Sequence, residues 1–158
     1  MKHKHITGIL GLLLLVGFII TRFILGINFK QECGGYLKRA ADANTVELAD
    51  KSLSTALQYI EREGLTSGYT SIFWRTPDED LGFWYENLSE SLKELRDLDE
   101  NTSSLEKSNM LLKLRETLLD SGEKGDNVTL PSGIAVYPSN LLFMIWGCFS
   151  LVLFLVGF

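Results

Sequence analysis

The residues best suited to chemistry are three consecutive carboxylates, Asp78, Glu79 and Asp80, which follow Thr76 and Pro77. Clustered carboxylates can hold a divalent cation, but calcium sites take their oxygens from a longer loop with a defined spacing, which this stretch lacks. A hydroxyl residue, a proline and then a glutamate are typical of a helix start, where acids are also favoured by the helix dipole. We therefore interpret the acids as helix capping, with Thr76 as the cap and Glu79 reaching back to it.

The rest of the chain contains no pattern typical of catalysis. The two histidines, His3 and His5, lie in a basic N-terminal tail and are interpreted as its solvated flank rather than as a metal site. A Gly-rich phosphate loop, a Ser/His/Asp set and a Cys/His metal spacing are all absent from the sequence. Cys33 and Cys148 are too few for a disulfide framework, so we expect two unpaired thiols, with an intermolecular bridge through Cys33 as the alternative. The prediction is a protein that is not an enzyme and has no metal or cofactor.

An aromatic group is the most distinctive candidate for binding. It consists of Tyr69, Phe73, Trp74, Phe83, Trp84 and Tyr85. Consecutive helical residues point about 100° apart, so the last three cannot all face one side. The group is either a small core that closes one end of the domain or a candidate interaction patch, because Trp and Tyr anchor protein interfaces. The architecture predicted below places it at the end of the domain farthest from the membrane.

Both ends of the chain are apolar. After the basic tail at residues 1–5, Ile6 to Ile27 contains one charge, Arg22, and Leu141 to Phe158 contains none. The first stretch is long enough to cross a hydrocarbon core of about 30 Å, and the second, with 18 residues, is at the lower limit for a spanning helix. We predict transmembrane helices at 6–27 and 141–158. A cleaved signal peptide is the alternative for the first stretch, although no clear small-x-small site follows it.

Charge is concentrated between these two stretches. All 20 acids lie from Glu32 to Asp126, against 12 Lys and Arg residues in 30–124. An acidic domain repels phosphate, so nucleic acid is not an expected partner. The basic tail favours a cytoplasmic N-terminus, whereas Arg22, Lys30, Lys38 and Arg39 favour the opposite orientation. The region between the spans exceeds about 60 residues, a length at which this charge rule weakens, and we predict that the middle domain is extracytoplasmic.

Two long helices are predicted in the middle domain. Apolar residues at spacings of three and four run from Val46 to Ile60 and from Leu81 to Leu95, which is typical of helices packed on one another. We predict helices at about 36–63, ending at Gly64, and at 77–120. The pair Gly34-Gly35 is either a hinge or a close-packing point.

The favoured architecture is an all-α membrane protein in which two transmembrane helices flank a coiled-coil-like antiparallel helical hairpin at residues 28–120. A three-helix bundle is the alternative, because Ser103 and Glu106 fit a second capping box. Residues 121–140 are expected to form a turn segment, with a short β-hairpin from Val128 to Tyr137.

The run from Gly68 to Tyr85, GYTSIFWRTPDEDLGFWY, resembles small uncharacterised two-span membrane proteins of cyanobacteria. The resemblance implies a bacterial plasma or thylakoid membrane. It implies no particular activity, so no functional residue is carried over from it.

A lone helical hairpin buries little apolar area for its length, so its stability depends on further packing. We therefore expect a non-enzymatic, membrane-anchored structural or accessory protein that associates with itself, as a homo-oligomer, or with a larger membrane complex. The alternative is an extracytoplasmic helical sensor or ligand-binding module that acts through a partner, an analogy of fold. A polar cavity between the helices would favour this alternative.

Overall fold

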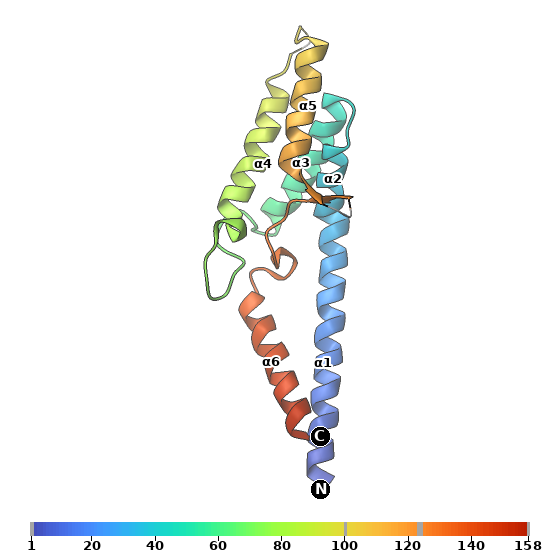
Figure 1. Cartoon of the computed structure of the whole chain (residues 1–158), viewed down its shortest axis with the longest axis vertical. Coiled ribbons are helices and arrows are strands. Elements are labelled where there is room, and N and C mark those ends of the chain that lie inside the picture. Colours follow the sequence, from blue (N-terminus) through green and yellow to red (C-terminus); the bar gives the residue numbers. More distant parts are fainter. Residues whose placement is uncertain (1, 100, 123–124, 158) are drawn as a thin grey trace.

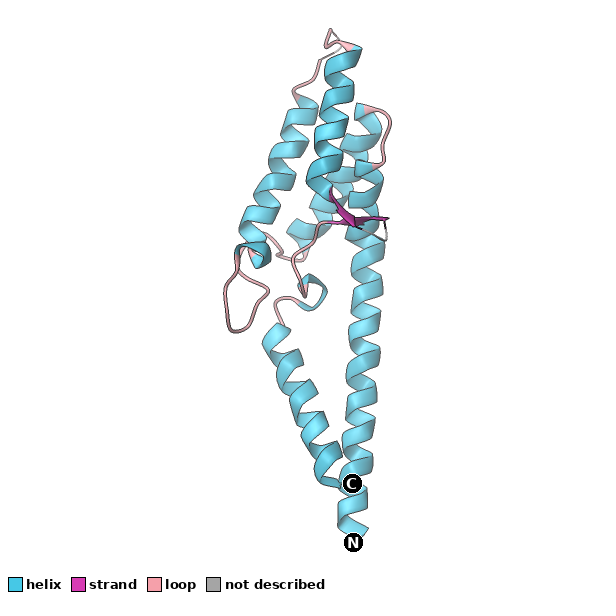
Figure 2. Ribbon diagram, viewed as in Figure 1, coloured by secondary structure: helices cyan, strands magenta, loops and turns pink. Residues whose placement is uncertain are grey.

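The protein is a narrow helical stem that widens at one end into a bundle of four helices (Figure 1). The computed structural model describes residues 2–99, 101–122 and 125–157. Helices make up most of the described chain, and its one sheet is a two-stranded hairpin (Figure 2). The N-terminal and C-terminal ends lie together at the far end of the stem.

One continuous helix connects the stem to the bundle. Helix α1 (Lys2–Phe29) passes through a π-helical turn, η1 (Lys30–Gly34), into α2 (Gly35–Ala41). The Gly35 N–H donates to the Lys30 carbonyl five residues back, and a Cβ at Gly35 would lie 2.9 Å from that oxygen. Gly35 is therefore a point of close backbone approach, whereas Gly34 has room for a side chain, and the helix passes both residues unbroken.

The predicted helix at 36–63 is wrong, because the chain reverses at residues 42–45. Helix α3 (Val46–Arg62) starts there, and the Leu48 N–H donates to the Thr45 hydroxyl at 3.3 Å as an N-cap. Thr45 thus caps the start of a new helix, within a stretch whose alanines alone favour one continuous helix.

The predicted helix at 77–120 is broken in the same way. Helix α4 (Leu81–Arg96) and helix α5 (Ser104–Leu118) are separate, and the Ser103–Glu106 capping box starts the second one. Thr76 does not cap α4: Pro77–Glu79 is a short 3₁₀ turn, η2, and the carboxylate of Asp80 accepts from the Gly82 and Phe83 N–H groups at 2.9 and 3.2 Å. The acid cluster therefore does cap the helix, through its last member.

Helices α2, α3, α4 and α5 enclose one apolar core. Its most completely buried large side chains include Leu37, Leu53, Ile60, Leu81, Leu95, Leu114 and Leu118. Helix α4 packs mainly on α3, and α5 mainly on α2, whereas α4 and α5 make little contact with each other. The domain is thus a four-helix bundle with one open side, instead of the predicted hairpin or three-helix bundle.

The segment after α5 also differs from the prediction. Strands β1 (Leu119–Gly122) and β2 (Gly125–Val128) pair antiparallel, with Leu119 opposite Val128. The predicted hairpin from Val128 to Tyr137 is absent, since Ile134–Val136 forms a 3₁₀ turn, η3, after Gly133 at φ +76°. Most residues in the observed strands are polar or glycine, and so have little strand propensity.

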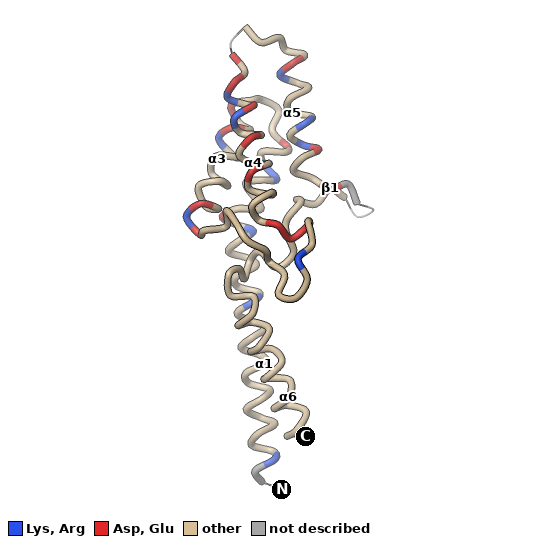
Figure 3. The backbone as a smooth tube through the Cα atoms, turned by 90° about the vertical axis from the view of Figure 1, so that its left-hand side faces the viewer, with Lys and Arg blue, Asp and Glu red and all other residues tan. Residues whose placement is uncertain are grey.

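Helix α6 (Asn140–Gly157) completes the stem by packing along α1. The two helices approach most closely near their ends, where a Cβ at Gly11 would lie 2.3 Å from the Phe154 nitrogen. Farther up, the Phe18 ring packs on Trp146 at 5.9 Å between centroids. Both helices are long and apolar enough to cross a membrane, and most of their side chains face outward. Figure 3 shows the acidic residues confined to the bundle end. Met1 of the predicted basic tail and Phe158, the predicted end of the second span, lie outside the described residues.

Candidate functional site: the 69–80 loop and the groove between α4 and α5

The six aromatic residues predicted as one patch separate onto three surfaces. Tyr69, Phe73 and Trp74 lie on the loop before α4, and Phe83 and Trp84 line a groove between α4 and α5. Tyr85 instead faces α3, where its hydroxyl donates to the Glu61 carboxylate at 2.9 Å. The group therefore combines parts of both interpretations: Trp84 is buried in the core, whereas Phe73, Trp74 and Phe83 are exposed.

The predicted location of the group is wrong. The aromatic loop lies at the end of the bundle next to the stem, and the α4–α5 connection lies at the opposite end (Figure 1). The reason is the additional reversal at residues 42–45. Because the chain turns back there, α3 descends toward the stem and the loop that follows it emerges beside α6.

The loop from residue 69 to 80 is closed at its base. Tyr69 and Asp80 form an isolated antiparallel bridge, and the Thr70 N–H donates to the Glu79 carbonyl at 3.1 Å. Within the loop, the Thr76 hydroxyl donates to the Glu79 carboxylate at 2.8 Å. Pinned ends and internal bonds are typical of a compact Ω-type loop with a defined shape.

The loop is also tied to the start of α6. The Asn140 side-chain amide donates to the Thr70 carbonyl at 2.9 Å and to the Gly133 carbonyl at 3.1 Å. The Tyr137 hydroxyl donates to the Ser67 carbonyl at 3.0 Å. The loop is therefore held at a fixed height relative to the stem.

The tip of the loop presents large apolar side chains. Phe73 is 71% exposed and Trp74 81% exposed, with ring centroids 5.9 Å apart. The Arg75 guanidinium lies 5.2 Å from the Tyr69 ring centroid, a cation–π contact. Neither the Phe73–Trp74 contact nor the Arg75–Tyr69 contact buries the loop tip within the described chain.

Behind the tip lies a small polar cluster. The oxygen atoms Thr70 Oγ1, Ser71 Oγ and Asn140 Oδ1 are buried and have no hydrogen-bond partner within the described residues. All three residues line one cavity of about 440 Å³ between the loop and the start of α6. Buried polar atoms of this kind are uncommon in folded proteins and reduce stability.

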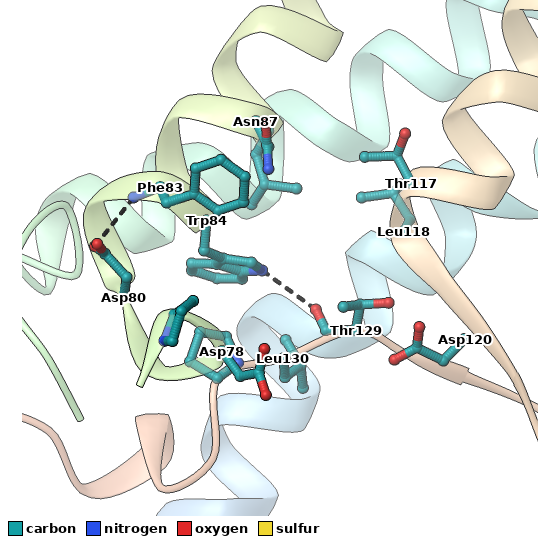
Figure 4. Close-up of a pocket in the computed structure, with 13 residues that line it drawn as sticks. Asp78, Asp80, Phe83, Trp84, Asn87, Thr117, Leu118, Asp120, Thr129 and Leu130 are labelled. Carbon is teal, nitrogen blue, oxygen red and sulfur yellow. Dashed lines mark hydrogen bonds between the residues drawn. The ribbon is translucent and has the colours of Figure 1, made fainter. Parts of the chain in front are cut away.

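The second candidate site is the groove on the open side of the bundle (Figure 4). It has a volume of about 550 Å³, an apolar wall that includes Trp84, Leu88 and Leu118, and an acidic border. The Trp84 indole N–H donates to the Thr129 carbonyl at 3.2 Å, which fixes the ring across the groove.

The chemistry available in the groove is binding. Its charged lining residues are Asp78, Asp80 and Asp120, and the lining contains no lysine, arginine, histidine or cysteine. Among the described residues, no group of three His, Cys, Asp or Glu side chains is placed to hold a metal ion. The groove thus suits an apolar side chain or an apolar group that carries positive charge.

Sequence reasoning missed this groove. Helices α4 and α5 form its two walls, but they were predicted as one continuous helix at 77–120. Residues 129–131, which also line it, were predicted to lie in a turn segment. Trp84 was recognised, but nothing in its spacing indicated that Thr129 lies opposite, 45 residues later.

Burial distinguishes the two cysteines. Cys33 is completely buried in the bundle core, and burial raises the pKa of its thiol to about 12. An intermolecular bridge through Cys33 is therefore incompatible with the folded bundle. Cys148 lies on the outward-facing side of α6.

Fold and surface together define a class of protein: a four-helix bundle joined to two helices that are long and apolar enough to cross a membrane. Comparison of the chain with protein-family models, with curated proteins and with solved structures finds no match in any of the three.

Proposed function

We propose that this is a non-enzymatic, membrane-anchored accessory protein whose four-helix bundle associates with a second copy or with a larger membrane complex. Helices α1 and α6 form the anchor. The continuity of α1 with α2, and the packing of α1 on α6, support an uncleaved first span. The basic N-terminal tail supports an extracytoplasmic bundle, in the plasma or thylakoid membrane that the cyanobacterial resemblance implies.

The observation that carries this proposal is the open side of the bundle. Phe83 lines the groove and is 63% exposed, while Leu105 and Leu112, elsewhere on α5 and outside the groove lining, are 69% and 55% exposed. Exposed large apolar side chains next to a pocket are the pattern of a protein interface, in which an anchor from the partner fills the pocket. The helices on the remaining sides of the bundle are already packed on one another.

The test is purification in mild detergent followed by crosslinking mass spectrometry. Wild-type protein is expected to elute as an oligomer or with a membrane protein, with crosslinks concentrated on α4 and α5. Phe83→Asp should abolish the association. Leu48→Asp is the matched control, because Leu48 is also exposed and is also the third residue of its helix, on another part of the bundle. A monodisperse monomer without a co-purifying protein would contradict the proposal.

A ligand-binding or sensor role is the second candidate, and the acidic groove favours it. Its three carboxylates and Trp84 would suit an organic cation with an apolar body. Thermal unfolding with a panel of aromatic and aliphatic amines, and with matching carboxylic acids, tests this role. An amine that raises the unfolding temperature of wild type, but not of Asp120→Asn, would support it. Equal effects of amines and acids would exclude it.

A further inference from the structure

We propose that the 69–80 loop inserts Phe73 and Trp74 into the boundary between headgroups and acyl chains of the membrane that α1 and α6 cross. The occupant of this exposed aromatic surface is thus membrane lipid. The inference rests on the proposed membrane anchoring and adds a third attachment point, supplied by the soluble domain.

The first argument is the position of the loop along the long axis of the molecule, relative to the start of α6. Figure 1 shows the lower end of the loop level with the first turn of α6. The bonds from Asn140 to Thr70 and from Tyr137 to Ser67 fix that height. If α6 begins at one membrane surface, the loop tip is at the same surface.

The second argument is continuity with the stem. Ile72, the residue before Phe73, lines a cavity of about 390 Å³ together with side chains of both stem helices, among them Phe18, Arg22 and Phe143. The loop therefore already shares an apolar surface with the helices that would be covered by lipid. Phe73 and Trp74 extend this surface outward and are more exposed than Ile72, which is 38% exposed.

The third argument is the order of side chains along the loop. Residues 69–74 carry no charge, Arg75 follows, and the acids Asp78 to Asp80 stand at the closed base next to the bundle. Aromatic residues concentrate at membrane–water interfaces, and arginine next to them can pair with lipid phosphate. Asp80 is held at the loop base by its bridge to Tyr69, whereas Glu79 lines the cavity behind the tip.

Three tryptophans allow a direct test, because the structure places them at three depths. Trp84 is buried in the bundle, Trp74 is at the loop tip, and Trp146 is in α6. Three full-length variants each keep one tryptophan and replace the other two by phenylalanine. Each variant is placed in phosphatidylcholine vesicles brominated either at the headgroup end or at the methyl end of the acyl chain, and its fluorescence is measured with and without aqueous iodide.

The proposal predicts a specific order of quenching. Trp74 should be quenched strongly by lipid brominated near the headgroup, several-fold less by lipid brominated near the chain end, and only weakly by iodide. Trp146 should be quenched by both lipids, and Trp84 by neither. Trp74 that is open to iodide and insensitive to both lipids would overturn the proposal, as would Trp74 shielded from lipid and iodide alike, which indicates a protein partner.

The outcome for Trp146 separates this inference from the proposed anchoring. If both lipids fail to quench Trp146, then α6 does not lie in the bilayer, and the anchoring itself is wrong. If Trp146 is quenched and Trp74 is not, only the loop proposal fails.

A second measurement covers the risk that Trp84→Phe perturbs the core. Trp74→Phe in the otherwise native chain removes only an exposed ring, so the bundle should keep its packing. Subtracting its quenching from that of wild type isolates Trp74 without any change at Trp84. Equal headgroup-end quenching of the two proteins would contradict insertion of the loop.

Discussion

Thr70, Ser71 and Asn140 place three oxygen atoms without hydrogen-bond partners in the described chain, behind the exposed loop tip. Asn140 nevertheless holds the loop to α6 with its amide nitrogen. At the scale of single residues, hydrogen bonds from Asn140 thus hold the loop in place, while the unpartnered oxygen atoms beside them reduce stability. Elsewhere in the bundle, polar side chains such as Thr45 and Ser103 are engaged in helix capping.

The first prediction concerns Thr70. It is almost completely buried with an unpartnered hydroxyl, so the isosteric Thr70→Val should leave the free energy of unfolding unchanged or raise it by up to about 1 kcal/mol. Thr45→Val is the control, since it removes a helix cap and should cost about 1 kcal/mol. Denaturant unfolding in detergent measures both. A loss at Thr70 as large as that at Thr45 would show that the Thr70 hydroxyl is bonded in the folded protein.

A second prediction concerns Arg115, which pairs with Asp42 at the α2–α3 turn and with Asp126 in β2. Hydrogen bonding from Lys38, together with the charges of Lys38 and Arg115, lowers the pKa of Asp42 below 3.8. A lowered carboxyl pKa stabilises the fold above the unfolded-state value, and this contribution is lost as pH falls through the folded-state value. Arg115→Gln should therefore lower the unfolding temperature slightly at neutral pH, because the pairs are solvent-exposed.

The pH dependence of that difference is the check. The difference in unfolding temperature between wild type and Arg115→Gln should become smaller as the pH falls below 3.8, the ordinary pKa of an aspartate. It should also become smaller at high salt. Thermal unfolding by circular dichroism across pH and salt measures it. A gap that stays constant with pH would mean that Arg115 acts through packing rather than through these ion pairs.

At the scale of elements, local patterns predicted helix faces better than helix ends. The apolar spacing from Val46 to Ile60 and from Leu81 to Leu95 does mark core positions of α3 and α4. Both reversals lie at short polar segments that end in an N-cap, and the Ser103 capping box was recognised as an alternative. A short hairpin before α6 was predicted, but its strands lie at 119–128 instead of 128–137, because the observed strands are mostly polar or glycine and have little strand propensity. The groove was missed because it depends on contacts between distant segments that no local pattern records.

The π-helical turn in the long helix leads to a third prediction. A Cβ at Gly35 would lie 2.9 Å from the Lys30 carbonyl oxygen, whereas a Cβ at Gly34 would meet nothing closer than Leu130 at 4.0 Å. Gly35→Ala should therefore disturb the π-helical turn and rotate Cys33, two residues earlier in the chain, out of the core. Gly34→Ala should preserve the turn and add helix propensity, worth about 1 kcal/mol.

Maleimide labelling of Cys33, in a Cys148→Ala background, measures this. Native Cys33 should react very slowly, since it is buried and its pKa is raised to about 12. Labelling should accelerate in Gly35→Ala and stay slow in Gly34→Ala. Equal rates in the two variants would show that the π-helical turn does not control the position of Cys33.

The stem leads to a fourth prediction. Small residues let helices approach closely in membranes, and Gly11 packs directly on the α6 backbone. Gly11→Ala should lower the free energy of unfolding of the stem by about 1–3 kcal/mol, the usual range for overpacking. Gly26→Ala is the matched control, because a Cβ there would meet no atom within 4 Å. Trp146 fluorescence, which senses its contact with Phe18, follows the unfolding; equal stabilities would rule out tight α1–α6 packing.

At the scale of the whole molecule, charge and hydropathy divide the chain into two parts with different surroundings. The stem exposes apolar side chains and has no acid among its described residues, whereas the acids lie in the bundle and the segments next to it, around an apolar core rich in leucine (Figure 3). This division was predictable from the sequence, because it depends on long runs of residues of similar polarity. The side of the bundle that faces the stem was not predictable, since it depends on the number of chain reversals.

The most direct test of membrane anchoring is cysteine accessibility in sealed vesicles. Single cysteines at Lys4 and at Ser108, both exposed, are introduced into a chain with Cys33→Ala and Cys148→Ala, and a membrane-impermeant maleimide is added outside. We predict that only one of the two positions is labelled until the vesicles are permeabilised, and that in inside-out vesicles it is the Lys4 position. Labelling of both positions from the same side of intact vesicles would contradict a stem that crosses the membrane.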